Sequence, residues 1–210
     1  MTNLAAAYRA AGRWSDALPL AREVVDRQKV RRGGEDSITL SSMALLAGIH
    51  EGSKDWSQAE PLHRERLAAV RKKNAPDTPA VAVVEFALGR NLLAQQKFAE
   101  AESLLRAALA TREQRLPEDW LTFNARSLLG AALVGQKRFT EAEPLLISGF
   151  EGMKAREEKI PRAAKGRLKD ALERLVQLFT ARNEPENAAA WQKKLDALET
   201  TQRPATAPQP

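Results

Sequence analysis

Few side chains in this sequence could take part in covalent or metal chemistry. The chain has two histidines, His50 and His63, and no cysteine. Both histidines fall in one predicted helical hairpin, so they could approach each other and bind a metal. Two ligands without cysteine and without a carboxylate pattern make a poor site, because zinc in proteins usually takes three or four protein ligands. We therefore interpret both as packing or surface histidines and expect no metal.

Two pairs of glutamates have the spacing at which a general acid and base might be sought: Glu100 with Glu102, and Glu141 with Glu143. Residues two apart on a helix point to different faces. These pairs also recur within one repeated phrase, at predicted helix N-termini where negative charge is favourable. The Gly33-Gly34 dipeptide lacks the lysine and flanking strand of a phosphate-binding loop and predicts a turn. We identify no catalytic residue and no cofactor, and predict that the chain is not an enzyme.

The composition is that of a helical, water-soluble protein. Of 210 residues, 43% are hydrophobic, 29% charged and 5% aromatic, which favours one domain or one elongated array over a sandwich or barrel. No apolar run approaches the roughly 18 residues of a membrane helix. The first residues lack the basic and apolar segments of a signal peptide. We expect a cytoplasmic protein with no membrane partner.

The net charge of +6 raises the question of nucleic acid. The basic residues gather where second helices are predicted to end, as at Arg31-Arg32 and Arg71-Lys72-Lys73. Cations at these ends complement the helix dipole and the unpaired carbonyls. No aromatic side chain alternates with them, as stacking on bases would require. Nucleic acid is therefore a disfavoured partner.

An internal repeat organises the chain. Trp14, Trp56, Phe98 and Phe139 follow one another at intervals of 42, 42 and 41 residues, each opening a similar phrase. A fixed period in this range is typical of repeat arrays, in which each unit buries its apolar face on its neighbour. The two tryptophans could be ligand platforms, but at hairpin positions we interpret them as core residues. We expect all four aromatics to occupy equivalent positions.

Each period predicts two helices. The third has apolar residues at helical spacing from Pro79 to about Gln96, and again from Phe98 to Arg115. The other units predict helices over 37–52 with 57–73 and over 120–136 with 140–157, and an amphipathic ending over 171–179 with 187–195. A proline recurs inside the second helices (Pro19, Pro61 and Pro144). With N-caps at Ser15, Ser57 and Thr140, these prolines would lie in the first turn, where the missing N–H costs little.

These residues resemble the tetratricopeptide repeat (TPR). The resemblance covers about residues 1–198 and implies a right-handed α-solenoid of about ten helices in antiparallel pairs. The matching positions are Leu4, Ala5, Tyr8, Gly12, Trp14 and Ala17; Leu46, Ala47, His50, Trp56 and Ala59; Leu88, Gly89, Leu92, Phe98 and Ala101; and Leu129, Gly130, Leu133, Phe139 and Ala142. The period and the alanine-glutamate-proline-leucine phrase look like the kinesin-light-chain subclass, which is common in bacteria. The ending resembles the arrays attached to bacterial serine/threonine kinases, although no kinase catalytic motif is present.

The resemblance also implies a binding face. The first helix of each pair would line a concave groove, at the positions Arg9, Glu51, Phe86, Arg90, Leu93 and Val134. Phe86 and Leu93 would supply an apolar patch, and Arg90 a forked donor for a carboxylate. The paired asparagines that hold peptide backbones in the subclass are here reduced to Asn3, because the other slots read Ala44-Leu45, Phe86-Ala87 and Ser127-Leu128.

The first hypothesis for function is therefore a protein-interaction scaffold that binds a peptide or a partner helix in this groove. An alternative from another class is the regulatory, substrate-docking C-terminal segment of a bacterial serine/threonine kinase involved in signalling. Its partners would then be the catalytic domain or its substrates. A second alternative is a helical repeat that binds nucleic acid.

We expect the array to span 1–199, with repeats at about 1–36, 37–78, 79–119 and 120–160, a degenerate capping repeat at 161–199, and a disordered proline-rich tail at 200–210. Only three residues precede Leu4, against nine before Leu88, so the first helix should be short. We expect this end to fray over residues 1–30 and to self-associate, as in a piece of a longer array.

Two further expectations concern packing and charge. We expect six small or apolar residues to be buried between consecutive units: Leu88, Ala101, Leu105, Leu129, Ala142 and Leu146. We also expect the ends of the second helices to form one basic edge, made of Arg31, Arg32, Arg71, Lys72, Lys73, Arg112, Arg115 and Arg156.

Overall fold

The computed structural model describes residues 1–202, which form ten α-helices and two short 3₁₀ helices and contain no strand. This confirms the predicted all-α fold with about ten helices. The helices are α1 (Thr2–Ala10), α2 (Trp14–Arg32), α3 (Ser37–Gly52), α4 (Trp56–Lys73), α5 (Pro79–Ala94), α6 (Phe98–Arg115), α7 (Trp120–Gly135), α8 (Phe139–Lys154), α9 (Gly166–Ala181) and α10 (Pro185–Gln202). The 3₁₀ helices η1 (Glu157–Lys159) and η2 (Arg162–Ala164) lie between α8 and α9.

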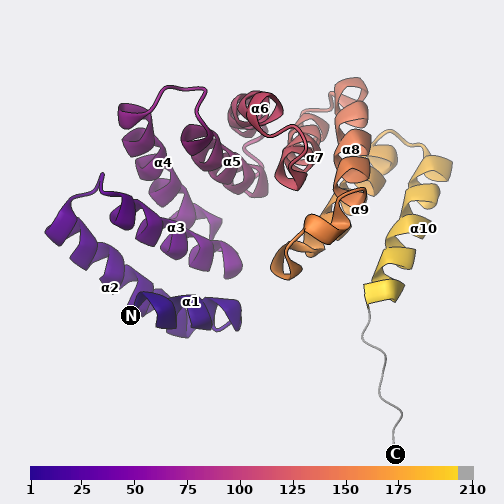
Figure 1. Ribbon diagram of the computed structural model, residues 1–210. Helices are drawn as coiled ribbons and strands as arrows, with labels where there is room; N and C mark the ends of the chain where they lie inside the picture. Colours follow the sequence, from indigo (N-terminus) through magenta and orange to yellow (C-terminus); the bar gives the residue numbers. More distant parts are fainter. Residues whose placement is uncertain (203–210) are drawn as a thin grey trace, which may run out of the picture. The chain divides into compact units, whose positions relative to one another are not determined.

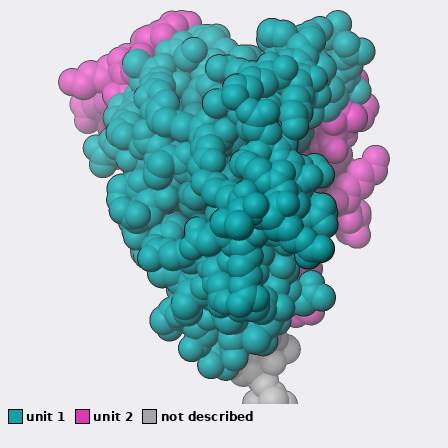
Figure 2. Space-filling view, turned by 90° about the vertical axis from the view of Figure 1, so that its left-hand side faces the viewer, with its two compact units in different colours: residues 1–115 teal, residues 116–210 magenta. Residues whose placement is uncertain are grey.

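Consecutive helices pack as pairs: α1 with α2, α3 with α4, α5 with α6, α7 with α8 and α9 with α10 (Figure 1). The chain divides into two compact units, residues 1–115 and residues 116–210, which Figure 2 colours separately. Unit 1 holds α1 to α6, and unit 2 holds α7 to α10. None of the described helices is long and apolar enough to cross a membrane.

The same turn closes every pair. Its central residue has a positive φ, between 59° and 70°, and is Gly12, Lys54, Gln96, Lys137 or Asn183. The next residue donates its backbone N–H to a carbonyl five residues earlier, as Lys97 does to Leu92 at 2.9 Å. This bond satisfies one of the carbonyls left free at a helix end, in the manner of a Schellman motif. The repeat is thus specified locally, although only the first of the five turns has glycine at the left-handed position.

The four repeating aromatics are the first residues of α2, α4, α6 and α8, so their predicted equivalence is confirmed. The predicted N-caps at Ser15, Ser57 and Thr140 are wrong, because the helices begin one residue before each of them. Ala17, for example, donates its N–H to Arg13 at 3.1 Å, which makes Arg13 the N-cap. Pro19 is therefore the sixth helical residue, beyond the first turn, and leaves the carbonyl of the exposed Ser15 without an intrahelical N–H.

The six residues expected to be buried are all at most 2% exposed. The close crossing at Ala101 lies within a hairpin and not between units as predicted. A Cβ on Gly89 of α5 would lie 2.8 Å from Cγ of Leu105 and 3.4 Å from the carbonyl of Ala101, both in α6. Gly130 would meet Leu146 and Ala142 in the same way, at 2.6 and 3.2 Å. Small residues therefore face each other on the two helices of one pair.

The ends of the array differ from its middle. Helix α1 has 9 residues, whereas α3, α5 and α7 each have 16. Met1 and Leu4 are each 48% exposed, so the start of α1 presents apolar surface. At the other end, α10 continues to Gln202 and corrects the expected start of the tail at Thr200. The rest of the predicted tail, 203–210, lies outside the described residues.

Candidate functional site

The predicted groove residues lie on four first helices. Arg9 is exposed on α1, and Leu93 of α5 and Val134 of α7 are half-buried. Five of the six belong to unit 1, whereas Val134 belongs to unit 2. Glu51 and Phe86 are 8% and 9% exposed, which leaves them little surface to offer a ligand.

Glu51 is the centre of a buried polar cluster that joins three helices of unit 1. Its Oε1 atom lies 3.0 Å from Nε2 of His63 on α4 and accepts a bond from Nδ2 of Asn91 on α5 at 3.4 Å. Its Oε2 atom is bound by the guanidinium of Arg90. Arg66 Nη1 lies 3.3 Å from Nδ1 of His63. A neutral His63 that donates from Nε2 and accepts at Nδ1 satisfies both neighbours.

The electrostatics of this cluster keep Glu51 ionised. Burial raises the pKa of Glu51, but the bond from His63 and the charge of Arg90 outweigh it, so the pKa is lower than the usual 4.5. Burial also lowers the pKa of Arg66, whose charge Glu51 helps to hold. Arg90 is thus engaged inside the protein, and the carboxylate that it was predicted to recognise in a partner is supplied by Glu51.

Phe86 is part of the interior of unit 1. The guanidinium of Arg112, on α6, lies over its ring at 5.4 Å from the centroid. Arg112 was predicted to belong to the basic edge, but it is only 5% exposed and so does not contribute to an exposed edge. The predicted apolar patch at Phe86 is therefore largely covered. On α5 the large apolar side chain that is well exposed is Val83, at 50%.

The remaining members of the basic edge mostly meet acidic residues. Three equivalent contacts join the last turn of a second helix, or the second residue after it, to the linker before the first helix of the same pair. They are Lys72 with Glu35 at 2.5 Å, Arg115 with Asp77 at 3.9 Å, and Arg156 with Glu118. Arg71 pairs with Glu85 at 2.8 Å. The three equivalent contacts close the open ends of these three hairpins, and all four ion pairs compensate part of the local positive charge.

The other histidine, His50, is 4% exposed, and its Nδ1 atom lies 3.4 Å from Oδ2 of Asp55. Each histidine therefore faces a carboxylate of its own hairpin. Among the described residues, no group of three or more histidine, cysteine, aspartate or glutamate side chains is arranged to hold a metal ion.

Unit 2 holds a cation that the sequence reasoning missed. Arg174, on α9, donates from Nη1 to the hydroxyl of Ser127 on α7 at 3.1 Å. Within residues 1–202 it makes no ion pair with a carboxylate, whereas Arg167 on the same helix pairs with Asp170 at 2.9 Å. Burial lowers the pKa of Arg174 to about 10, and Asp170 and Glu173 partly oppose this change. Arg174 therefore stays charged at neutral pH and has free N–H donors.

Most of the helical hairpins match a known repeat family, and the matched residues end before α9. Models of the tetratricopeptide repeat match residues 1–72 and residues 86–149. The chain belongs to the tetratricopeptide repeat family. Comparison with curated proteins finds no significant match.

Three solved structures show the same fold. A putative kinesin light chain with nearly identical TPR-like repeats from Podosopora anserina has a TM-score of 0.73 at 21% identity, over 97% of this chain and 95% of that one. BtubC (BKLC) from P. vanneervenii has a TM-score of 0.69 at 18% identity, over 99% and 82%. MamA from Desulfovibrio magneticus RS-1 has a TM-score of 0.63 at 16% identity, over 96% and 94%. These likenesses show the fold of a TPR solenoid, and one of the three structures is named as a putative kinesin light chain, the subclass that the sequence resembles.

Proposed function

We propose that this TPR protein is a non-enzymatic interaction scaffold that binds an acidic segment of a partner protein on its first-helix faces. TPR repeats generally mediate protein–protein interactions, and the observation that carries the finer proposal is Arg174. Its guanidinium has five N–H donors in a fixed fork, and the described residues occupy one of them, through Ser127.

A carboxylate is the ligand that fits this arginine. A half-buried cation with no carboxylate directly bonded to it has lost part of its hydration. A charged hydrogen bond to a partner's carboxylate would replace that lost hydration. The fork geometry matches a carboxylate in two parallel bonds. The nearby carboxylates of Asp170 and Glu173 do not take the place of a partner's carboxylate at Arg174. Asp170 is paired with Arg167, and Glu173 lies 3.8 Å from Lys169.

In unit 1 the proposal keeps Arg9 and Leu93 as groove residues and adds Val83. Arg9 is exposed on α1, while Val83 and Leu93 give α5 accessible apolar surface. An extended peptide or a helix with an apolar residue would bury that surface. Arg90, Glu51 and Phe86 would shape this face from beneath. Val134 remains the proposed groove residue on α7 of unit 2.

The test is an array of peptides of varied sequence. Each peptide is made with a free C-terminus, with an amidated C-terminus, and with its aspartate and glutamate residues replaced by asparagine and glutamine. Affinities of the binding peptides are then measured by fluorescence polarisation for the wild type, Arg174→Met, Arg174→Lys and the exposed control Arg162→Met. We expect selected peptides to need a carboxylate and Arg174→Met to weaken binding about tenfold or more, because a desolvated charge pair is lost. Arg174→Lys should keep part of the affinity. Equal affinity for the wild type and Arg174→Met would refute the proposed anchor.

The kinase-attached role stays a prediction, and no contact within residues 1–202 favours it over another scaffold role. The nucleic-acid alternative has little support from the charge distribution. Lys72, Arg115 and Arg156 contact acidic side chains, so fewer cations are available to phosphates than the sequence suggests.

A further inference from the structure

Helix α2 carries a largely exposed row of side chains, which we call the α2 stripe: Leu18, Arg22, Asp26 and Val30. Members four residues apart form one ridge along a helix. Arg22 and Asp26 are exposed, Leu18 is half-buried, and Val30 is 91% exposed. The inward face of α2 is formed by Ala17, Ala21, Val24 and Val25. Leu18 lies at the edge of this face and packs partly against the core of unit 1, whereas the other three residues of the stripe are exposed.

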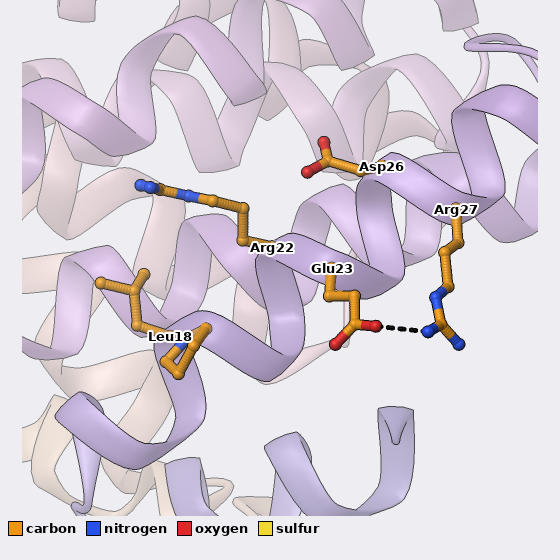
Figure 3. Close-up of a pocket in the computed structure, with 6 residues that line it drawn as sticks. Leu18, Arg22, Glu23, Asp26 and Arg27 are labelled. Atoms are coloured by element: carbon orange, nitrogen blue, oxygen red, sulfur yellow. Dashed lines mark ion pairs between the residues drawn. The ribbon is translucent and has the colours of Figure 1, made fainter.

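A shallow hollow of about 400 Å³ lies along this part of α2, lined by Leu18, Pro19, Arg22, Glu23, Asp26 and Arg27. Figure 3 shows Arg22 and Asp26 on one side of the helix and the Glu23–Arg27 ion pair, at 2.5 Å, on the other. Neither Arg22 nor Asp26 has an ion pair in the described part of the chain. An arginine four residues before an aspartate is the less favourable order for pairing within a helix. The stripe therefore presents one positive and one negative charge that are not used internally.

The order of apolar and charged residues in the stripe makes it complementary to a second copy of itself. Read along α2 it is apolar, positive, negative, apolar; read backwards it is apolar, negative, positive, apolar. When two copies of α2 lie antiparallel about a two-fold axis at the level of residue 24, Arg22 of each copy faces Asp26 of the other. Leu18 of each copy then faces Val30 of the other. A two-fold interface requires this kind of self-complementary patch.

We propose that the α2 stripe is a homodimer interface, and that its partner is a second copy of this chain. Two reciprocal ion pairs form at the centre, and two contacts between Leu18 and Val30 flank them. Val30 loses its apolar surface, which is 91% exposed within residues 1–202. The interface is one helix wide, so it is smaller than a standard stable interface and the dimer should be weak, with dissociation in the micromolar range or above.

The experiment is sedimentation equilibrium of the full chain over a wide concentration range, with charge-reversal and charge-swap variants. Arg22→Asp and Asp26→Arg each place like charges opposite each other, and each should weaken dimerisation about tenfold or more. The double variant Arg22→Asp/Asp26→Arg restores opposite charges at both contacts and should return to within about threefold of the wild type. Arg162→Asp and Glu158→Arg, exposed in unit 2, control for the change in net charge.

Disulfide trapping tests the register, and the absence of native cysteine makes it clean. Chains with Leu18→Cys mixed with chains with Val30→Cys should form a crosslinked heterodimer under oxidising conditions. Either variant alone should crosslink poorly, because residues 18 and 18 of two copies are then about 18 Å apart along the helix. Thermal unfolding checks that each variant is folded. A wild type that stays monomeric at every concentration, a dimer that survives both single reversals, or a charge swap without rescue would each overturn the proposal.

Discussion

Replacing Glu51 by glutamine is the sharpest test of the cluster that joins α3, α4 and α5. The glutamine keeps the shape of the side chain but removes the charge that faces His63, Arg90 and Asn91. One end of the amide is also a donor, and it would meet another donor. A hydrogen bond to a charged group contributes about 1.5–3 kcal/mol, and breaking a fully buried ion pair costs about 3–5 kcal/mol. The Arg90 side chain is 28% exposed, so water recovers part of this loss. We expect a loss of about 2–3 kcal/mol in the free energy of unfolding.

The assay is urea unfolding followed by far-UV circular dichroism, with Glu23→Gln as the matched control. Glu23 pairs with Arg27 on the surface, where the side chains are 44% and 68% exposed. Such a pair contributes less than about 0.5 kcal/mol. If Glu51→Gln costs no more than Glu23→Gln, the cluster does not hold the three helices together and the reasoning fails.

Acidification gives an independent check of the same residue. The pKa of Glu51 in the folded protein is lower than its ordinary value of 4.5. Its contribution is therefore complete above that value and is lost as the pH falls through the folded pKa. The difference in unfolding free energy between the wild type and Glu51→Gln should be constant near neutral pH and should shrink below about pH 4.5. A difference that stays constant into the acid range would mean that the charge of Glu51 contributes nothing.

Three further predictions follow from the repeat. Gly12→Ala should cost about 1 kcal/mol in thermal unfolding, because φ is +70° there. Apart from the two chain neighbours of Gly12, no residue has an atom within 4 Å of the new Cβ, so the cost comes from the backbone conformation and not from a clash. Ala101→Leu and Ala142→Leu should each cost about 1–3 kcal/mol by overpacking a fully buried crossing, and a change within error at both would contradict the packing. Burial raises the pKa of Glu60, but hydrogen bonds to its carboxylate, of which the one from Lys97 has the largest effect, lower the pKa to about 2. The Lys97→Ala variant removes that bond, so an NMR titration should show a higher pKa for Glu60 than in the wild type.

The helices could be predicted closely because the period, the prolines and the aromatics mark their ends. Helix α6 begins at Phe98 and ends at Arg115, as the spacing indicated. The second-helix N-caps were misplaced because serine and threonine are favoured caps. In this repeat the fourth residue of each of these second helices donates its backbone N–H to the carbonyl of the residue before the aromatic. That residue is therefore the N-cap, and the helix begins at the aromatic. The turns themselves were harder to place, since four of the five have a residue other than glycine at positive φ.

The site was less predictable because counting positions in a motif assumes that each side chain is free. Glu51 and Arg90 are 39 residues apart, three fewer than the period, so they meet across neighbouring first helices. An acidic and a basic residue 39 positions apart in the sequence could therefore have predicted an ion pair inside the protein. Arg174 had a different signal: it lies among the buried residues Ala171, Leu175 and Leu178, where a lone arginine is out of place.

The junctions between repeats show where the chain departs from its own pattern. At the second junction Glu60 accepts bonds from Gln95 at 2.8 Å and from Lys97 at 2.6 Å. In unit 2, Glu143 of the same phrase likewise pairs with Arg182. The glutamate recurs at the period, and Arg182 stands at the position that corresponds to Gln95, so a polar contact at this place is part of the repeat.

At the first junction all three of these positions have changed. Leu18 replaces the glutamate, Ser53 the glutamine and Asp55 the lysine. Leu18 packs against the apolar core of unit 1, and a hollow of about 440 Å³ opens beside it, lined in part by Trp14 and Ser53. The first hairpin is therefore held largely by apolar contacts with α3 and α4 and by the Lys29–Glu65 pair at 2.8 Å. Because a polar bridge is missing here, this hairpin should exchange its amide hydrogens faster than α5 and α6, which would agree with the fraying expected for residues 1–30.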